Sequence, residues 1–542
     1  MKRDPAALVN GPFDVVVVGG GFVGACVAWD AALRGWRVAL LERTDFGAGV
    51  SANSLKILHG GLRYLQRLDV RRMRESIAER ATWLRIAPHL VEPLPVLVPT
   101  RARGLQRKAT LGAAVRVADG FFPGRNRGLH PDRRLPAGRL LSRAEALETV
   151  PELAHGLPDL DGAVLFHDAQ LYSAERLVLE IVRAAAEGGA TVVNHLAVRD
   201  ALMEPGRIAG VRARDELTGD ELSIRGRAVV VAAGDSSAEL SARLTGAATV
   251  TSPACVGVNL VLNRDPPPCA VGVSSGVPDP SRRLGLPGRQ LFVVPWRGRT
   301  MVGTGYYPVE RPIRPGPADA DELAARFLGE VRRAWPALSD ARLRDVVRVH
   351  RGRLPARRAR RAGECRLEQA ARITDHGRDG AAGLFSVTAV KLTTARALAE
   401  RVVDLVGRAL GRPGTPCRTP STLLPGSSRT STDELRREAG RRLERILPPE
   451  VVDHLVRCYG RDYAAVAAAA EADARMRERV QDDSPVIRAQ LRHAVSEEMA
   501  CTPDDLLLRR TEIGARGRVS ETSRRAAAEA LAGPRPAGGG HA

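Results

Sequence analysis

The sequence predicts an α/β protein built from a Rossmann-type dinucleotide-binding domain, an antiparallel-sheet domain and a C-terminal helical domain. An apolar strand over residues 13–18 leads through a glycine-rich turn into a helix over 25–34, which is the start of a βαβ unit. Short apolar segments between 253 and 305 are typical of antiparallel strands. Residues 433–531 follow a helical pattern almost throughout. The chain has 542 residues, too many for one hydrophobic core, so several domains are expected.

The glycine-rich turn fits the pattern G-x-G-x-x-G at Gly19, Gly21 and Gly24. In this pattern the first glycine permits the tight turn, the second lets a pyrophosphate approach the backbone, and the third permits close helix–strand packing. Glu42, at the end of the next strand over 36–41, is placed to accept hydrogen bonds from ribose hydroxyls. A glycine-rich turn without a ligand is the alternative, and the strand–turn–helix context disfavours it.

FAD is favoured over NAD as the dinucleotide. An enzyme that takes electrons from NAD(P)H usually carries a second fingerprint of this kind, and none follows a strand elsewhere in the sequence. The apolar segment over 228–232 predicts a strand that passes close to the dinucleotide, so Ala233 and Gly234 at its end are predicted contacts.

The net charge of +20 invites a nucleic-acid interpretation, but the basic residues are spread along the chain without interleaved aromatic side chains. We therefore expect no nucleic acid as a partner. An anionic substrate or an anionic membrane surface would use the same charge. No apolar run is long enough to span a bilayer and no signal peptide is evident, which predicts a cytoplasmic protein, with peripheral association at the inner face of the cell membrane as a further expectation.

Only four of the 82 basic residues are lysines, so each lysine inside a motif is a hint that a compact ammonium is needed there. Lys56 and Lys391 are two such lysines. The seven cysteines are scattered without a C-x-x-C pair, which indicates neither a metal site nor a disulfide framework.

Residues 51–65, Ser-Ala-Asn-Ser-Leu-Lys-Ile-Leu-His-Gly-Gly-Leu-Arg-Tyr-Leu, resemble the FAD-dependent glycerol-3-phosphate dehydrogenase family. Further segments that resemble it are residues 30–35, 87–93, 295–296, 302–304, 391–394, 424–426 and 504–511. The resemblance implies a D-amino-acid-oxidase-like fold with FAD as cofactor. It also implies oxidation of sn-glycerol 3-phosphate, a small anionic substrate, to dihydroxyacetone phosphate, with electrons passed from the flavin to a quinone or another acceptor.

The resemblance also implies roles for individual residues. Arg63, Tyr64 and Lys391 are expected at the substrate side of the flavin as catalytic residues. His59 is expected to contact the flavin or to serve as the base, and a structural histidine is the alternative. Lys56 is expected to stabilise the backbone beside the flavin. The expected cofactor-binding set, besides the glycine-rich turn and its strands, comprises Ser54, Lys56, His59, Gly60, Gly61, Gly352, Leu392, Thr393 and Thr394.

The sequence departs from the family at the substrate side. The family's Gly-Val-Arg-Pro-Leu motif corresponds to residues 352–356 with Leu354 in place of the arginine, and the neighbours of Leu354 face elsewhere on an extended segment. Ala389 and Val390 replace a pair of glycines, and Ala395 replaces a frequent tyrosine. Two alternatives therefore stay open: a related flavin oxidase or dehydrogenase for an amine or a non-phosphorylated hydroxy acid, and a non-catalytic flavoprotein.

The domain boundaries follow from these segments. We expect an FAD-dependent oxidoreductase unit over 12–412, a linker over 413–432, a helical domain over 433–531 and a disordered tail over 532–542. Within the first unit the FAD-binding parts are expected at about 12–100, 155–252 and 345–412, and the substrate domain at about 101–154 and 253–344. The sequence leaves the oligomeric state open, with a homodimer among the alternatives.

Overall fold

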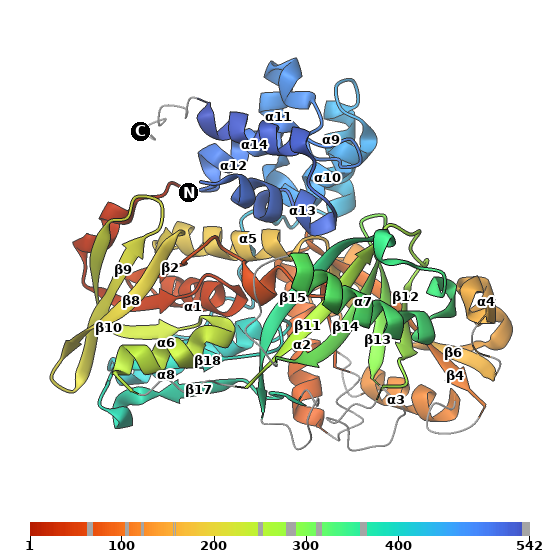
Figure 1. The fold of residues 1–542 in the computed structure, drawn as a ribbon, viewed down its shortest axis with the longest axis horizontal. Helices are drawn as coiled ribbons and strands as arrows, with labels where there is room; N and C mark the ends of the chain where they lie inside the picture. The colour runs from red at the N-terminus through yellow and green to blue at the C-terminus, as the bar shows by residue number, and fades with distance from the viewer. Residues whose placement is uncertain are drawn as a thin grey trace.

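The computed structural model describes residues 1–61, 69–102, 108–120, 124–155, 157, 159–247, 253–277, 289–309, 317–357 and 366–533. These residues form two sheets side by side, and the C-terminal helices sit as a separate layer over α5 (Figure 1). The predicted α/β class with its Rossmann-type, antiparallel-sheet and C-terminal helical parts is confirmed.

The first sheet is the Rossmann-type sheet, ordered β17-β18-β10-β1-β2-β7 with the β8–β9 hairpin extending from β10. Its central strands run parallel, as Val17 pairs with Leu40 on one side and Val230 on the other. Its strands are β1 (Phe13–Val18), β2 (Val38–Leu41), β7 (Thr191–Val193), β8 (Leu196–Glu204), β9 (Arg207–Asp215), β10 (Glu221–Val231), β17 (Arg372–Asp375) and β18 (Leu384–Thr388). The parallel strands are almost wholly buried, because helices and a second layer cover both faces.

Helices α1, α5 and α8 pack together on one side of this sheet. Trp29 on α1 is completely buried among them, and every residue of α1 from Gly24 to Ala32 is buried. The helices outside the C-terminal domain are α1 (Phe22–Leu33), α2 (Val70–Ile86), α3 (Lys108–Gly120), α4 (Arg143–Thr149), α5 (Ala174–Glu187), α6 (Ser237–Thr245), α7 (Pro317–Ala334) and α8 (Ala395–Ala409). This packing fixes the N-terminal end of α1 at the carboxyl ends of β1 and β2.

The second sheet has ten strands in the order β16-β15-β11-β14-β13-β12-β4-β6-β3, with β5 paired to β6. All its pairs are antiparallel except β12 with β4. Its strands are β3 (Ile57–Leu58), β4 (Val91–Arg101), β5 (Arg139–Ser142), β6 (Leu160–Leu171), β11 (Ala254–Leu262), β12 (Ala270–Ser274), β13 (Gln290–Trp296), β14 (Arg299–Pro308), β15 (Val346–Arg357) and β16 (Arg366–Leu367).

Much of this sheet comes from segments that the sequence assigned to the FAD-binding parts. Most of β4 and all of β6 and β15 come from those segments, and all three strands lie in the second sheet. The pairings responsible join distant residues, such as Val91 with Leu171 and Gly257 with Gly352, which no local pattern reveals.

Cys255 of β11 is disulfide-bonded, although the cysteine spacing indicated no disulfide framework.

The C-terminal domain consists of short helices that pack on α5 and β15 (Figure 1). They are α9 (Thr432–Leu443), α10 (Pro449–Tyr459), α11 (Tyr463–Ala472), α12 (Arg488–Glu497), a π-helix, η12 (Asp505–Arg510), α13 (Ile513–Arg516) and α14 (Glu521–Ala532). The segment before them is tied to α2, since Leu424 and Ser427 both donate hydrogen bonds to the Ile86 carbonyl. The expected disordered tail lies, from residue 534, outside the described residues.

No helix within the described ranges is long and apolar enough to cross a membrane.

Candidate functional site

One large cavity, of about 2180 Å³, joins the glycine-rich turn of the first sheet to the second sheet. Its lining includes Gly19 and Glu42 at one end and His59, Phe292 and Lys391 at the other. Pockets for drug-sized ligands are roughly 300–1,000 Å³, so this cavity has room for a dinucleotide together with a small substrate.

The three fingerprint glycines differ in what requires them. A Cβ at Gly19, where φ is +109°, would lie 2.6 Å from the Ala232 carbonyl oxygen, and a Cβ at Gly24 would overlap the Gly19 carbonyl oxygen. Any larger residue at position 19 or 24 would therefore clash with the backbone. A Cβ at Gly21 would meet only the Ser51 hydroxyl, at 3.1 Å. Packing within the protein therefore does not require glycine at position 21. This agrees with a position where a ligand approaches the backbone closely.

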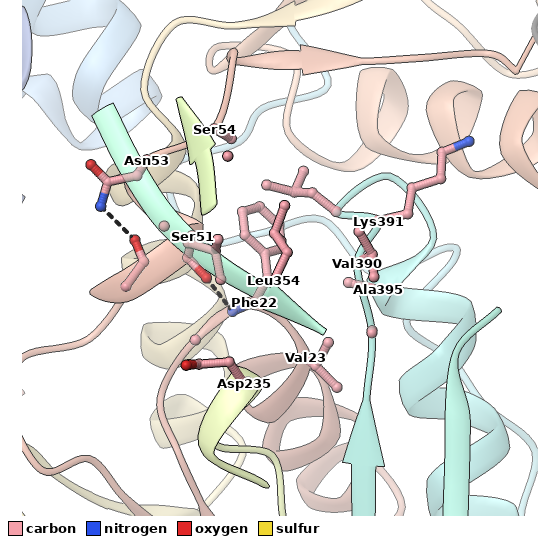
Figure 2. A pocket seen from close by; sticks show the side chains of 18 of the residues that line it. Phe22, Val23, Ser51, Asn53, Ser54, Asp235, Leu354, Val390, Lys391 and Ala395 are labelled. Atoms are coloured by element: carbon pink, nitrogen blue, oxygen red, sulfur yellow. Dashed lines mark hydrogen bonds between the residues drawn. The ribbon is translucent and has the colours of Figure 1, made fainter. Parts of the chain in front are cut away.

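The N-terminal end of α1 opens toward this cavity. Its N-cap residue is Gly21, which has no side chain to accept a capping hydrogen bond. The Ser51 hydroxyl accepts a hydrogen bond from the Phe22 N–H instead, at 3.1 Å (Figure 2). The N–H groups and dipole of a helix N-terminus suit a pyrophosphate. Sequence reasoning placed Ser54 at the cofactor, where it lines the cavity, but missed the contact of Ser51 with α1.

Glu42 is buried at the carboxyl end of β2 with most of its acceptor capacity in use. Its Oε2 accepts from the Gly20 N–H at 2.7 Å, and Oε1 accepts from the N–H and hydroxyl of Thr44 at 2.9 and 3.0 Å. A carboxylate has about four lone-pair directions, so one remains for a ribose hydroxyl. Glu42 thus holds the glycine-rich turn and also faces the cavity.

The other predicted contacts near the first sheet line the same cavity. Ala233 and Gly234 follow β10, and the φ of Gly234 is +64°. Leu392, Thr393 and Thr394 come from the loop before α8. The Thr393 carbonyl accepts a hydrogen bond of 3.0 Å from the Trp83 indole, which ties this loop to α2.

His59 is partly exposed and lies against a buried polar cluster beside the second sheet. Its Nδ1 is 3.1 Å from Asp168 Oδ2, and its ring centroid is 5.1 Å from that of Phe292. Asp168 Oδ1 accepts from the Gly60 N–H at 2.7 Å and from Arg80 at 2.6 Å. A Cβ at Gly60 would overlap the Arg80 guanidinium, which explains the glycine there. Gly61, with φ of +87°, lines the cavity next to this cluster.

Lys391 is held against α2. Its Nζ donates a hydrogen bond of 2.6 Å to the Ser76 hydroxyl, which in turn donates to the Arg72 carbonyl at 2.7 Å. Burial lowers the pKa of Lys391 to about 8, against the opposing charges of Asp168 and Glu75. Figure 2 shows the Lys391 ammonium directed away from Leu354 and Val390. Both Lys391 and Ser76 line the cavity.

Lys56 has a different environment from Lys391. It is completely buried with φ of +61°, and its Nζ donates to the Ala52 carbonyl at 2.7 Å and to the Glu175 carboxylate at 2.7 and 2.8 Å. Its neighbours Leu55 and Ile57 line the cavity, whereas Lys56 itself does not. Lys56 therefore supports the loop from the side opposite the cavity.

Leu354, predicted from the sequence to occupy the position of the family's arginine, forms part of the cavity wall. Gly352 and Leu354 of β15 line the cavity, and a Cβ at Gly352 would lie 2.5 Å from Val50. Arg351 and Arg353 do not line it, and Arg353 lies 3.1 Å from the Asp235 carboxylate. Neither flanking arginine therefore contributes its side chain to the cavity wall.

Three further observations complete the description of the site. Arg63 and Tyr64 lie outside the described residues, so their predicted positions are not part of this geometry. Arg289 lines the cavity, but its guanidinium is engaged by the Glu330 carboxylate and the Tyr306 carbonyl. Among the residues the structure describes, no cluster of His, Cys, Asp and Glu side chains could hold a metal ion.

Two protein-family models together match most of this chain. Residues 14–405 match the family model described as FAD dependent oxidoreductase, and residues 417–533 match that of the C-terminal domain of alpha-glycerophosphate oxidase. A glycerol-3-phosphate dehydrogenase of Synechocystis sp. is 30% identical over 94% of this chain and 90% of its own length. The human mitochondrial glycerol-3-phosphate dehydrogenase is 30% identical over 92% of this chain and 67% of its own length.

A solved structure also resembles this chain along most of its length. It is a glycerol-3-phosphate dehydrogenase from Bacillus halodurans in complex with FAD. The TM-score is 0.70 at 25% sequence identity, and the match covers 94% of this chain and 87% of that one.

Proposed function

Because the chain belongs to the FAD-dependent oxidoreductase family, we propose that it oxidises sn-glycerol 3-phosphate, or a related small hydroxy compound, to dihydroxyacetone phosphate, with electrons passing from the flavin to a quinone or another acceptor. The predicted FAD dependence is confirmed by the family. The observation that carries the proposed substrate is the match to glycerol-3-phosphate dehydrogenases across both the oxidoreductase and the C-terminal parts.

The cavity fits FAD at the end formed by the first sheet. The open space at Gly21, the N-terminal end of α1 and the free acceptor direction of Glu42 match a pyrophosphate and a ribose. Ser54, Gly61, Ala233, Gly234 and the loop before α8 would border the rest of the cofactor. When bound, FAD supplies the acceptor for a hydride.

The residues at the other end of the cavity have the chemistry that alcohol oxidation needs. Removing a hydride from carbon 2 requires a base for the hydroxyl proton, and His59 is the proposed base. A cation should stabilise negative charge that develops in the reaction, and Lys391 is the proposed cation. Arg63 and Tyr64 complete the proposed substrate side by resemblance.

Leu354 favours a second candidate, a dehydrogenase or oxidase for an amine or a non-phosphorylated hydroxy acid. Such a substrate has no phosphate and would tolerate the apolar side chain in the cavity wall. Product analysis separates the two candidates. Dihydroxyacetone phosphate formed from glycerol 3-phosphate supports the first, whereas an imine-derived or keto-acid product from a panel of amines and hydroxy acids supports the second.

The remaining proposals concern the whole chain. We propose an oxidoreductase unit over 12–412 that is joined through a linker over 413–432 to a helical domain over 433–531. We also propose that the protein adsorbs to an anionic membrane surface through its net charge of +20. Re-oxidation of the reduced flavin by a soluble quinone analogue and by oxygen, measured side by side, tests the proposed acceptor.

A further inference from the structure

We propose that Asp168 is a positioning residue for the oxidation, because its carboxylate fixes His59 in the tautomer that presents Nε2 as the proton acceptor. The inference rests on the proposed role of His59 as the base. Asp168 belongs to none of the motifs by which the sequence resembles its family.

Asp168 lies in the C-terminal third of β6, at a buried position where an unpaired carboxylate would be costly. It is only 4% exposed, yet its oxygens receive hydrogen bonds from three directions: His59 Nδ1 at 3.1 Å, the Gly60 N–H at 2.7 Å and Arg80 at 2.6 Å. Arg80 is itself fixed by a second hydrogen bond of 2.8 Å to the His167 carbonyl. The carboxylate is therefore held in one orientation, as a buried charge with satisfied partners should be.

Asp168 is ionised in this environment. Burial by itself would raise the pKa of its carboxyl group, but the hydrogen bond from His59, the charge of Arg80 and the Gly60 N–H together hold the pKa well below its usual range. An ionised carboxylate only accepts hydrogen bonds. The nitrogen that faces it, His59 Nδ1, must therefore carry a proton.

This assignment determines what the rest of the imidazole can do. A neutral histidine protonated at Nδ1 has its lone pair on Nε2. The His59 side chain is 37% exposed and lines the cavity, and Nε2 makes no hydrogen bond to any described residue. Contact with the Phe292 ring limits rotation of the imidazole. The lone pair is thus on the nitrogen across the ring from the one that faces Asp168, in a side chain that lines the cavity.

The resulting step is balanced in protons and electrons. With FAD bound to accept it, a hydride with its two electrons would leave carbon 2 as the substrate hydroxyl gives its proton to His59 Nε2, and the C–O single bond would become a carbonyl. His59 is then an imidazolium with both nitrogens protonated, and the negative charge of Asp168 stabilises it. Asp168 does not take the proton itself, because Arg80 and Gly60 keep it ionised.

The matched variants are Asp168→Asn and, as a control, Glu79→Gln. Glu79 is also a buried carboxylate bound to an arginine, Arg396 at 2.6 Å, but it does not line the cavity. An asparagine at 168 can donate its amide N–H to Nδ1 and move the imidazole proton to Nε2. The same exchange in a serine-protease triad lowers the turnover number by about 10⁴-fold. We expect Asp168→Asn to slow anaerobic flavin reduction by at least about 100-fold at an unchanged substrate dissociation constant.

The control separates positioning from structural support. Glu79→Gln should retain the wild-type rate even if both variants melt at a lower temperature. A rate for Asp168→Asn within a few-fold of wild type would overturn the proposal, as would an equal loss of rate in both variants.

A direct measurement covers the case in which Asp168→Asn does not fold or hold FAD. Nitrogen-15 NMR of histidine-labelled wild-type holoenzyme, with the His59 signals assigned by His59→Gln, reports which ring nitrogen bears the proton. We expect Nδ1–H, and a dominant Nε2–H form would overturn the proposal. Failure of the proposed function is recognised separately, because wild-type flavin would then not be reduced by glycerol 3-phosphate while the tautomer remained measurable.

Discussion

Replacing Lys391 by methionine should make the protein more stable and much less active, which is the opposite of what a structural lysine would do. Burial lowers the pKa of the ammonium from 10.5 to about 8. One pKa unit corresponds to about 1.4 kcal/mol, so the charged group costs the folded protein about 3 kcal/mol at neutral pH. Methionine removes this cost with a side chain of similar length.

The pH dependence of this effect has a definite sign. Below about pH 8 the ammonium is charged in both the folded and the unfolded chain, and its full cost is present. Between about pH 8 and 10.5 the folded protein has released the proton while the unfolded chain still binds it, so wild-type stability rises with pH relative to Lys391→Met. The stability advantage of the variant should therefore shrink across this window.

Activity should follow the charged form. Removing one charge-stabilising group typically costs about 100-fold or more in rate, so Lys391→Met should reduce its flavin at least that much more slowly while keeping FAD bound. The wild-type rate should fall above about pH 8, as the ammonium loses its charge. Lys391→Arg should restore little activity, because a guanidinium does not replace a compact ammonium bonded to Ser76.

The assay is stopped-flow anaerobic flavin reduction across this pH range, with urea unfolding of the same samples. A Lys391→Met protein with near-normal rates, or one that is several kcal/mol less stable than wild type, would refute the reasoning.

Three other predictions follow from the site and the charge. Gly21→Val should give colourless protein, because a side chain there enters the space proposed for the pyrophosphate. The control variant Gly440→Val, on the open face of α9, should stay yellow. A normal FAD content in Gly21→Val would count against the proposed FAD site. Leu354→Arg should tighten binding of glycerol 3-phosphate by roughly ten- to 150-fold, since a hydrogen bond to a charged group contributes about 1.5 to 3 kcal/mol, and an unchanged dissociation constant in titrations would contradict it. The protein should sediment with anionic but not neutral vesicles and be released by salt, and equal partitioning onto both would argue against adsorption through charge.

The parts of this protein that follow from short stretches of sequence could be predicted. The turn from Gly19 to Gly24 and the acidic residue after β2 depend on residues that are close in the chain, and the structure places them around one cavity. The alternation of β15 likewise predicted that Arg351 and Arg353 would face away from the side of Leu354.

What could not be predicted depends on contacts between distant segments. Asp168 meets His59 across more than a hundred residues, and Ser76 meets Lys391 across more than three hundred. A charged residue within the apolar strand β6 was a usable signal, since a buried carboxylate needs a partner, but the sequence does not identify the partner. Lys56 is another example. It lies in the segment 51–65 that resembles the family, but its ammonium is bonded to the distant Glu175 and does not line the cavity.

The central claim is that this flavoprotein oxidises a phosphorylated small alcohol. The most direct measurement is anaerobic bleaching of the bound flavin by glycerol 3-phosphate and by glycerol at matched concentrations. Our account predicts that glycerol 3-phosphate bleaches the flavin and that glycerol does so far more slowly. If neither compound bleaches it while an amine or a non-phosphorylated hydroxy acid does, the proposed substrate is wrong.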